Sequence, residues 1–213
     1  MSLTFDFASE AIHQADQIIE ETEKLEAKIQ NDHNRKDTTK FLSDVLIYDR
    51  LSGLGKHWAS EVVFDMGTDH SHRVDFVLFE PAGGSKVSDI EKGQFTCFEI
   101  KSCKEDVYSG NGLNFFGEKN YIVTTMETWK DIQQDFTSGK LKEYIKKNYP
   151  DSCLNFGIIV VTPRYRKPED EFLDPTPITS DNHWKTSVVI PCRSGKREKS
   201  MTEMLFCMLR AGK

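Results

Sequence analysis

Two opposite charges end an apolar stretch in the middle of the chain. Residues 94–101 read Gln-Phe-Thr-Cys-Phe-Glu-Ile-Lys, and such a run after a glycine predicts a β-strand buried on at least one face. Side chains alternate along a strand, so Glu99 and Lys101 share one face while Phe98 and Ile100 share the other. Burying a charge costs on the order of several kcal/mol unless it is paired or binds a metal. The pair therefore predicts either a salt bridge or a catalytic site.

A second acid lies in the middle of another apolar run, residues 72–80. Alternation places Asp75 on one face with Val77 and Phe79, and Val74 on the other face with Phe76. A carboxylate between apolar residues on a strand needs a partner. If this strand and residues 94–101 form a hairpin, we expect Asp75 to meet an acid of the neighbouring strand.

Asp75 and Glu99 side by side would repel each other, which raises a carboxyl pKa or recruits a cation. Mg²⁺ or Mn²⁺ prefers oxygen ligands, and the backbone carbonyl of Ile100 could complete the set with waters. Lys101 beside them could polarise or deprotonate a water on the ion. The pattern predicts a metal site that hydrolyses a phosphodiester.

These residues resemble the PD-(D/E)xK nuclease superfamily, and within it the MmcB-like branch of small nuclease-like proteins of bacteria and phages. The resemblance covers roughly residues 42–162. It is carried by Asp75, the triplet Glu99-Ile100-Lys101, Glu61 on the preceding predicted strand, the segment 98–106, Asn114-Phe115 and the segment 120–123.

The resemblance implies a restriction-endonuclease-like fold and a DNA endonuclease or exonuclease that depends on Mg²⁺ or Mn²⁺, in DNA repair or in phage and mobile-element DNA processing. It implies metal ligation by Asp75, Glu99 and the Ile100 carbonyl, a catalytic Lys101, and a supporting acid at Glu61. It also makes Asp106, Asn114 and Lys119 candidates for contacts with substrate or with the ligands themselves.

Two alternatives stay open. Asp75, Glu99 and Lys101 could form a structural ion cluster with Arg73. The chain could also be a nuclease fold that binds nucleic acid or a protein without cleaving, since residues 110–117 replace an Asp and a Lys-Trp pair found in several MmcB-like members. A Glu-x-Lys triplet alone carries little weight, because residues 26–28 show the same pattern on an acidic segment.

Basic residues indicate where DNA could bind. Phosphate contacts of lysine and arginine dominate the affinity of most DNA-binding proteins. The segment 193–195 just before a closing helix could seat a phosphate at the N-terminus of that helix. The full set of candidates is Arg73, Lys104, Asn114, Lys119, Arg164, Arg166, Arg193, Lys196 and Arg197.

Hydrophobic periodicity predicts an α/β fold in which helices flank a mixed central sheet. The predicted strands cover residues 58–64, 72–80, 94–101, 120–125 and 155–162, and residues 183–191 are expected to form a short edge strand or an extended segment. The predicted helices cover residues 7–30, 38–51, 129–149 and 197–210, with a short helical piece at 113–116. Residues 81–93 and 163–182 are expected to be loops.

We expect two parts, an acidic N-terminal helix (residues 1–32) and a nuclease-like α/β domain (33–213). The N-terminal part holds eight acids and two lysines, which accounts for the whole net charge of −6. Its heptad-like seam could bind a second copy or a protein partner, or the helix could be a solvated one that packs on its own domain. Without an apolar run of about 20 residues or a signal peptide, we expect a cytoplasmic protein that does not enter a membrane. The five cysteines, none in a C-x-x-C pair, should be reduced.

Overall fold

The structure is a computed structural model that describes residues 34–84, 86–178 and 182–211. The chain divides into two units between Thr38 and Thr39, and the fold below is that of the second unit. The predicted acidic helix at residues 7–30 lies outside the described residues.

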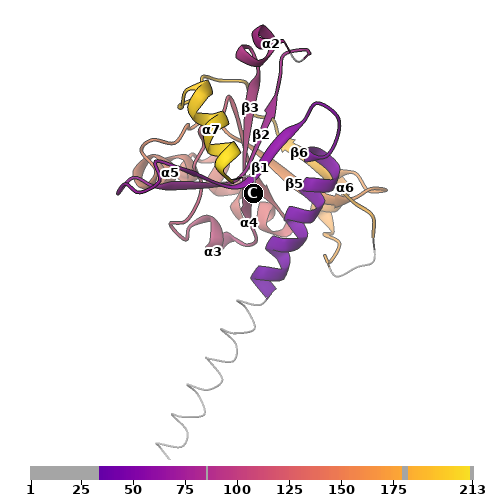
Figure 1. Ribbon diagram of the computed structural model, residues 1–213. Helices are drawn as coiled ribbons and strands as arrows, with labels where there is room; N and C mark the ends of the chain where they lie inside the picture. The colour runs from indigo at the N-terminus through magenta and orange to yellow at the C-terminus, as the bar shows by residue number, and fades with distance from the viewer. Residues whose placement is uncertain (1–33, 85, 179–181, 212–213) are drawn as a thin grey trace, which may run out of the picture. The chain divides into compact units, whose positions relative to one another are not determined.

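One open six-stranded sheet forms the centre of this unit, with the strands in chain order from β1 to β6. The strands are β1 (His57–Phe64), β2 (His72–Glu80), β3 (Gln94–Lys101), β4 (Lys119–Thr124), β5 (Gly157–Pro163) and β6 (Trp184–Ile190). The pairs β1–β2, β2–β3 and β5–β6 are antiparallel, whereas β3–β4 and β4–β5 are parallel. The predicted mixed α/β sheet is confirmed, and all six predicted strands are present (Figure 1).

One face of the sheet is covered by residues 39–46, which are helical and continue into a π-helical turn, η1 (Ile47–Leu51). Leu42, Leu46 and Leu51 have no exposed surface and pack on side chains of β2 to β5. Phe98 and Ile100 of β3 belong to this cluster, so they lie on the face that alternation predicts for them.

The other face is covered by three helices, α4 (Met126–Thr137), α5 (Lys140–Asn148) and α7 (Met201–Ala211). Side chains of α4 and α5 pack on Ile122 of β4 and Ile158 of β5. Helix α7, yellow in Figure 1, packs on β1, β2 and the beginning of β3, where it meets Cys97. Because Glu99 follows Cys97 by two residues and is paired with Ile122, it lies on this face between the two clusters.

Several helix predictions need correction. Residues 113–116 are not helical, and the short helix of this connection is α3 (Lys104–Val107), because three glycines follow it before β4. The single helix predicted at 129–149 is two helices, α4 and α5, separated by Gly139 in a left-handed conformation (φ 86°). Two connections expected to be loops hold α2 (Val87–Glu91) and α6 (Pro168–Leu173).

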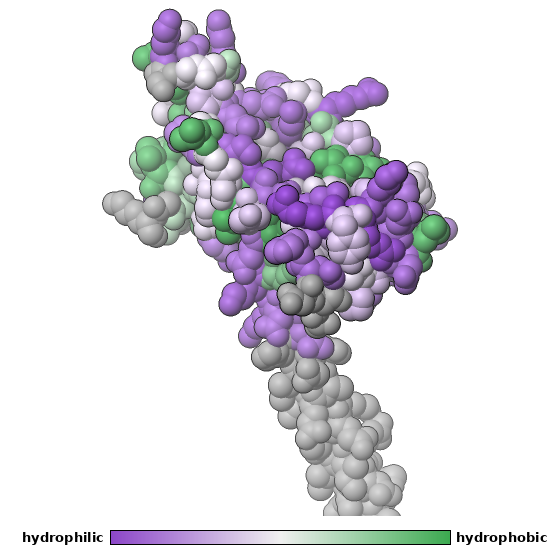
Figure 2. Space-filling view, turned by 90° about the vertical axis from the view of Figure 1, so that its right-hand side faces the viewer, coloured by the Kyte–Doolittle hydropathy of each residue, from purple (hydrophilic) through white to green (hydrophobic). Residues whose placement is uncertain are grey.

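The view in Figure 2 shows mostly hydrophilic side chains, with hydrophobic ones in separate spots. Within the described ranges, no helix is long and apolar enough to cross a membrane. All five cysteines are free, as expected, and burial raises the pKa of the Cys97 thiol to about 12.

Candidate active site

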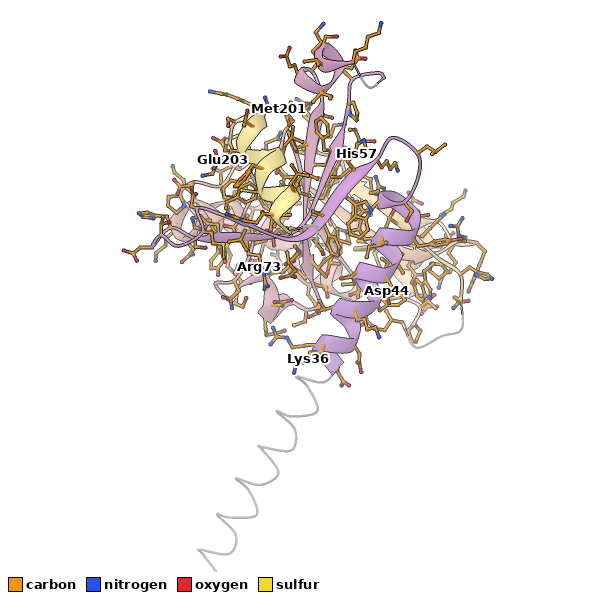
Figure 3. The ribbon with its side chains drawn as sticks, viewed as in Figure 1. Lys36, Asp44, His57, Arg73, Met201 and Glu203 are labelled. Carbon is orange, nitrogen blue, oxygen red and sulfur yellow. The ribbon has the colours of Figure 1, made fainter. Side chains whose placement is uncertain are left out.

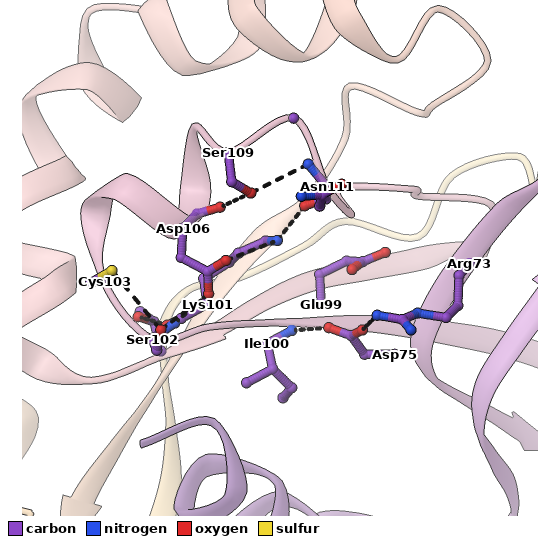
Figure 4. A network of polar contacts seen from close by, with 12 residues as sticks. Arg73, Asp75, Glu99, Ile100, Lys101, Ser102, Cys103, Asp106, Ser109 and Asn111 are labelled. Atoms are coloured by element: carbon purple, nitrogen blue, oxygen red, sulfur yellow. Dashed lines mark hydrogen bonds and ion pairs between the residues drawn. The ribbon is translucent and has the colours of Figure 1, made fainter. Parts of the chain in front are cut away.

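The candidate site lies at the carboxyl end of β3, where β2 leaves it. The last paired residues of the two strands are Phe76 and Phe98. Beyond that pair a side chain replaces the backbone: Oδ2 of Asp75 accepts a hydrogen bond of 2.8 Å from the backbone N–H of Ile100 (Figure 4). Because the N–H and C=O of one strand residue point to the same neighbouring strand, the Ile100 carbonyl points toward this gap as well.

Glu99 is completely buried beside this gap. Its Oε1 accepts a hydrogen bond of 3.0 Å from the backbone N–H of Asn114. Its Oε2 is also buried, and it has no hydrogen-bond donor among the residues that the structure describes. Burial, and after it the negative charge of Asp75, raise the pKa of Glu99 well above its ordinary value, against the opposing charge of Lys101 and the backbone N–H groups of Asn114 and Leu113.

Lys101 ends β3 on the same face and is 4% exposed. Its Nζ donates a hydrogen bond of 2.6 Å to the backbone carbonyl of Asn111, and it lies 3.9 Å from Oδ1 of Asp106. Asp106 is fixed in turn, because its Oδ2 accepts hydrogen bonds from the backbone N–H and the hydroxyl of Ser102. Figure 4 shows Glu99 between the Lys101–Asn111 contact and the Asp75–Ile100 contact.

A glycine covers the two charges. A Cβ built on Gly112 would lie 2.7 Å from Oε2 of Glu99 and 2.9 Å from Nζ of Lys101. Gly112 has φ 75°, and the next residue, Leu113, has φ 70°, which is uncommon for a residue other than glycine. The backbone therefore approaches the carboxylate more closely than any side chain would allow.

Glu61 and Arg73 form the outer rim of the site. Nη1 of Arg73 lies 2.7 Å from Oε2 of Glu61, and its Nη2 lies 4.0 Å from Oδ1 of Asp75. Arg73 is the second residue of β2, and it lies at the end of this strand opposite α2 (Figures 1 and 3). Asn114, which is buried, donates from Nδ2 to the carbonyl of Arg73 at 2.8 Å. Asn114 therefore joins this rim to Glu99 and is a structural part of the site.

The alternation predicted for β2 is wrong at this point. Val74 packs with Val77 and Phe79 beneath α7, while Phe76 packs on the opposite face of the sheet. The cause is a break in the ladder at the position where Glu61 would pair with Asp75: Glu61 has φ 54°, a left-handed conformation. Strained backbone of this kind is concentrated at functional sites.

A cavity of about 600 Å³ opens over these groups. Its lining includes Glu61, Arg73, Asp75, Ile100 and Lys101, so the structure brings the predicted residues to one place, with Glu99 just behind the lining. Several further residues in the lining were not predicted from the sequence, among them Asn111, Gly112 and Tyr149. The glycines at 110, 112 and 117 were the signal, since they indicate close backbone approach.

Most of the predicted DNA-binding residues outside the cavity are engaged within the protein. Lys104 contacts Asp135, Arg164 contacts Asp49, Arg166 contacts Glu171, and Arg197 contacts Glu118. Arg193 and Lys196 are exposed and Lys119 is half-buried. The predicted start of the closing helix is wrong, because α7 begins only at Met201, and the phosphate seat at residues 193–195 stays a prediction.

These outer residues also lie away from the acids. Arg197 contacts Glu118, which accepts a hydrogen bond from the N–H of Phe95 near the beginning of β3. At about 3.3 Å per strand residue, that end is roughly 13 Å from Glu99. Arg164 follows the carboxyl end of β5, two strands from β3 and therefore about 10 Å along the sheet.

Across the described part of the chain, no group of three or more His, Cys, Asp and Glu side chains is arranged to hold a metal ion. The carboxylates of Asp75 and Glu99 with the Ile100 carbonyl include only two such side chains, so they do not form a group of this kind. No family model, curated protein or solved structure matches this chain.

Proposed function

We propose that this protein is a Mg²⁺- or Mn²⁺-dependent DNA nuclease of the PD-(D/E)xK type, with a restriction-endonuclease-like fold. The observation that carries the proposal is the meeting of Asp75, Glu99 and Lys101 at one strand end, with the Ile100 carbonyl directed into the same gap. The two acids, Asp75 and Glu99, are 24 positions apart along the chain, so it is the fold that brings them together.

The residues fit a hard divalent ion. Oε2 of Glu99 is a buried carboxylate oxygen that lacks a hydrogen bond among the described residues. Oδ1 of Asp75 has an arginine at 4.0 Å, which is longer than a direct hydrogen bond. Such oxygens are the donors that Mg²⁺ prefers. Bound there, the ion would supply charge stabilisation to the phosphate that is attacked.

The other side chains take roles that follow from their positions. Lys101 has its ammonium beside Glu99, where it can bind the phosphate or polarise the attacking water. Glu61, which now holds Arg73, would support a ligand or a second ion. Arg73 lines the cavity with 60% of its side chain exposed, and it could turn from Glu61 to a phosphate oxygen.

The test is cleavage of plasmid and single-stranded DNA with Mg²⁺ or Mn²⁺ by the full chain and by Lys101→Ala. Lys92→Ala serves as the control, because Lys92 is exposed and precedes the opposite end of β3. We expect Lys101→Ala to lose cleavage while Lys92→Ala keeps it. Equal cleavage by all three proteins, or none by any, would contradict the proposal.

A second candidate function is a non-cleaving module that binds nucleic acid or a protein. The ion contacts of Arg73 with Glu61 and Asp75 favour it, because an arginine there already neutralises acids that a metal would need. Calorimetry decides between the two. DNA binding without uptake of Mn²⁺ by the wild type, and with unchanged affinity in Asp75→Asn, would support the binding module.

A further inference from the structure

The loop at residues 110–113 lies between the cavity and the buried acid. Gly112 is placed against Oε2 of Glu99, and the carbonyl of Asn111 takes the hydrogen bond of Lys101. Each of these contacts involves a group that the proposed chemistry needs. The loop thus lies between Glu99 and the cavity and contacts Lys101, which itself lines the cavity.

Two buried polar side-chain atoms lack a hydrogen-bond partner of normal geometry among the described residues, and the first lies directly against this loop. One is Oε2 of Glu99 and the other is the hydroxyl of Tyr149, a residue that lines the same cavity as Gly110, Asn111 and Gly112. A buried polar group without a partner is unfavourable by roughly 1–3 kcal/mol. Oε2 of Glu99, against which Gly112 lies, would gain water or ligand contacts if the loop moved away.

The loop is also held in an uncommon backbone conformation. Gly110, Gly112 and Leu113 all have positive φ angles, of 81°, 75° and 70°. Such conformations persist where surrounding contacts hold them, and they are frequent in ligand clamps and switch regions. Here the contacts are the Lys101–Asn111 hydrogen bond and a hydrogen bond of 3.1 Å from the N–H of Gly110 to the hydroxyl of Tyr144.

We propose that loop 110–113 is an autoinhibitory cover that must leave Glu99 and Lys101 before a divalent cation can bind. An ion at the 2.0–2.1 Å typical of Mg²⁺ ligation needs an open side of the carboxylate, and Oε2 has no exposed surface to offer. When the cover opens, Lys101 exchanges the Asn111 carbonyl for substrate. The inference rests on the proposed function, since it concerns access to the same groups.

Glycine variants of the full chain test the cover. Gly112→Ala places a Cβ against Glu99 and Lys101, whereas Gly110→Ala has the same left-handed strain with no atom within 4 Å of its Cβ. We expect Gly112→Ala to bind Mn²⁺ severalfold more tightly than Gly110→Ala in calorimetry, because the added Cβ pushes the loop outward. Equal affinities of the two variants would overturn the inference.

Hydrogen exchange of the wild type tests it without any substitution. Saturating Mn²⁺ should accelerate exchange in peptides covering residues 110–113 severalfold, and unchanged or slower exchange would overturn the inference. DNA cleavage with unchanged exchange would refute the cover and leave the proposed function intact. Accelerated exchange without DNA cleavage would support the cover and refute the proposed function. If the wild type, Gly112→Ala and Gly110→Ala all fail to bind Mn²⁺, the cover and the proposed function are both refuted.

Discussion

Replacement of Glu99 by glutamine removes a buried charge and keeps the shape of the side chain. The amide oxygen can still accept the hydrogen bond from the N–H of Asn114, and the repulsion from Asp75 disappears together with the smaller attraction to Lys101. A buried charged group with an unpaired oxygen costs about 1–3 kcal/mol. We therefore expect Glu99→Gln to raise the free energy of unfolding by about 1–3 kcal/mol at a pH above the folded-state pKa of Glu99, with Tm rising about 2–4 °C per kcal/mol.

The gain should depend on pH in a defined direction. The folded-state pKa of Glu99 lies above its ordinary value of 4.5, so between the two values the folded protein holds more protons than the unfolded chain. Stability of the wild type then falls as pH rises through that interval. Because Glu99→Gln lacks this titration, its advantage should be full above the folded-state pKa and should vanish near pH 4.5.

Urea unfolding followed by tryptophan fluorescence, at pH 4.5 and at a pH above the folded-state pKa of Glu99, measures both effects. The matched control is Glu118→Gln, at the other end of β3, where the carboxylate is paired with Arg197 at 2.6 Å and accepts from the N–H of Phe95. That variant should lose stability. The reasoning fails if Glu99→Gln is less stable than the wild type at the higher pH, or if its advantage does not shrink toward pH 4.5.

Three further predictions concern other parts of the protein. Burial alone would raise the pKa of Asp49, but hydrogen bonds from Thr186 and the charges of Arg164 and Arg50 lower it. Asp49→Asn should therefore lower the free energy of unfolding by about 1–3 kcal/mol at pH 7. Urea titrations should show this loss shrinking as pH falls below 3.8. Ile122→Ala in the core should cost about 2–5 kcal/mol, against less than about 0.5 kcal/mol for the 79% exposed Leu173→Ala, by the same measurement. If Arg193 and Lys196 bind DNA phosphates, their joint replacement by alanine should reduce the slope of log K against log salt by roughly 2, and an unchanged slope would exclude them.

Much of the sheet follows from the sequence because its signals are local. Apolar runs bounded by glycine and polar turns predict all six strands, and the alternation of β3 places Glu99 and Lys101 on the face opposite Phe98 and Ile100. The helix predictions were less accurate where a single residue turns the backbone, as Gly139 does between α4 and α5. A period of 3.6 residues continues through such a glycine in the sequence but not in space.

The sequence by itself determined which residue types could do chemistry and which strand carries the Glu99-Ile100-Lys101 triplet. Only the tertiary structure decided that the side chain of Asp75 accepts the hydrogen bond from the N–H of Ile100. It also decided that Glu61 interrupts the pairing of β1 with β2 and that Gly112 packs against the carboxylate of Glu99. The physical reason is that alternation is a property of one strand. Where two strands separate, and which loop fills the space, depends on contacts between segments far apart in the chain.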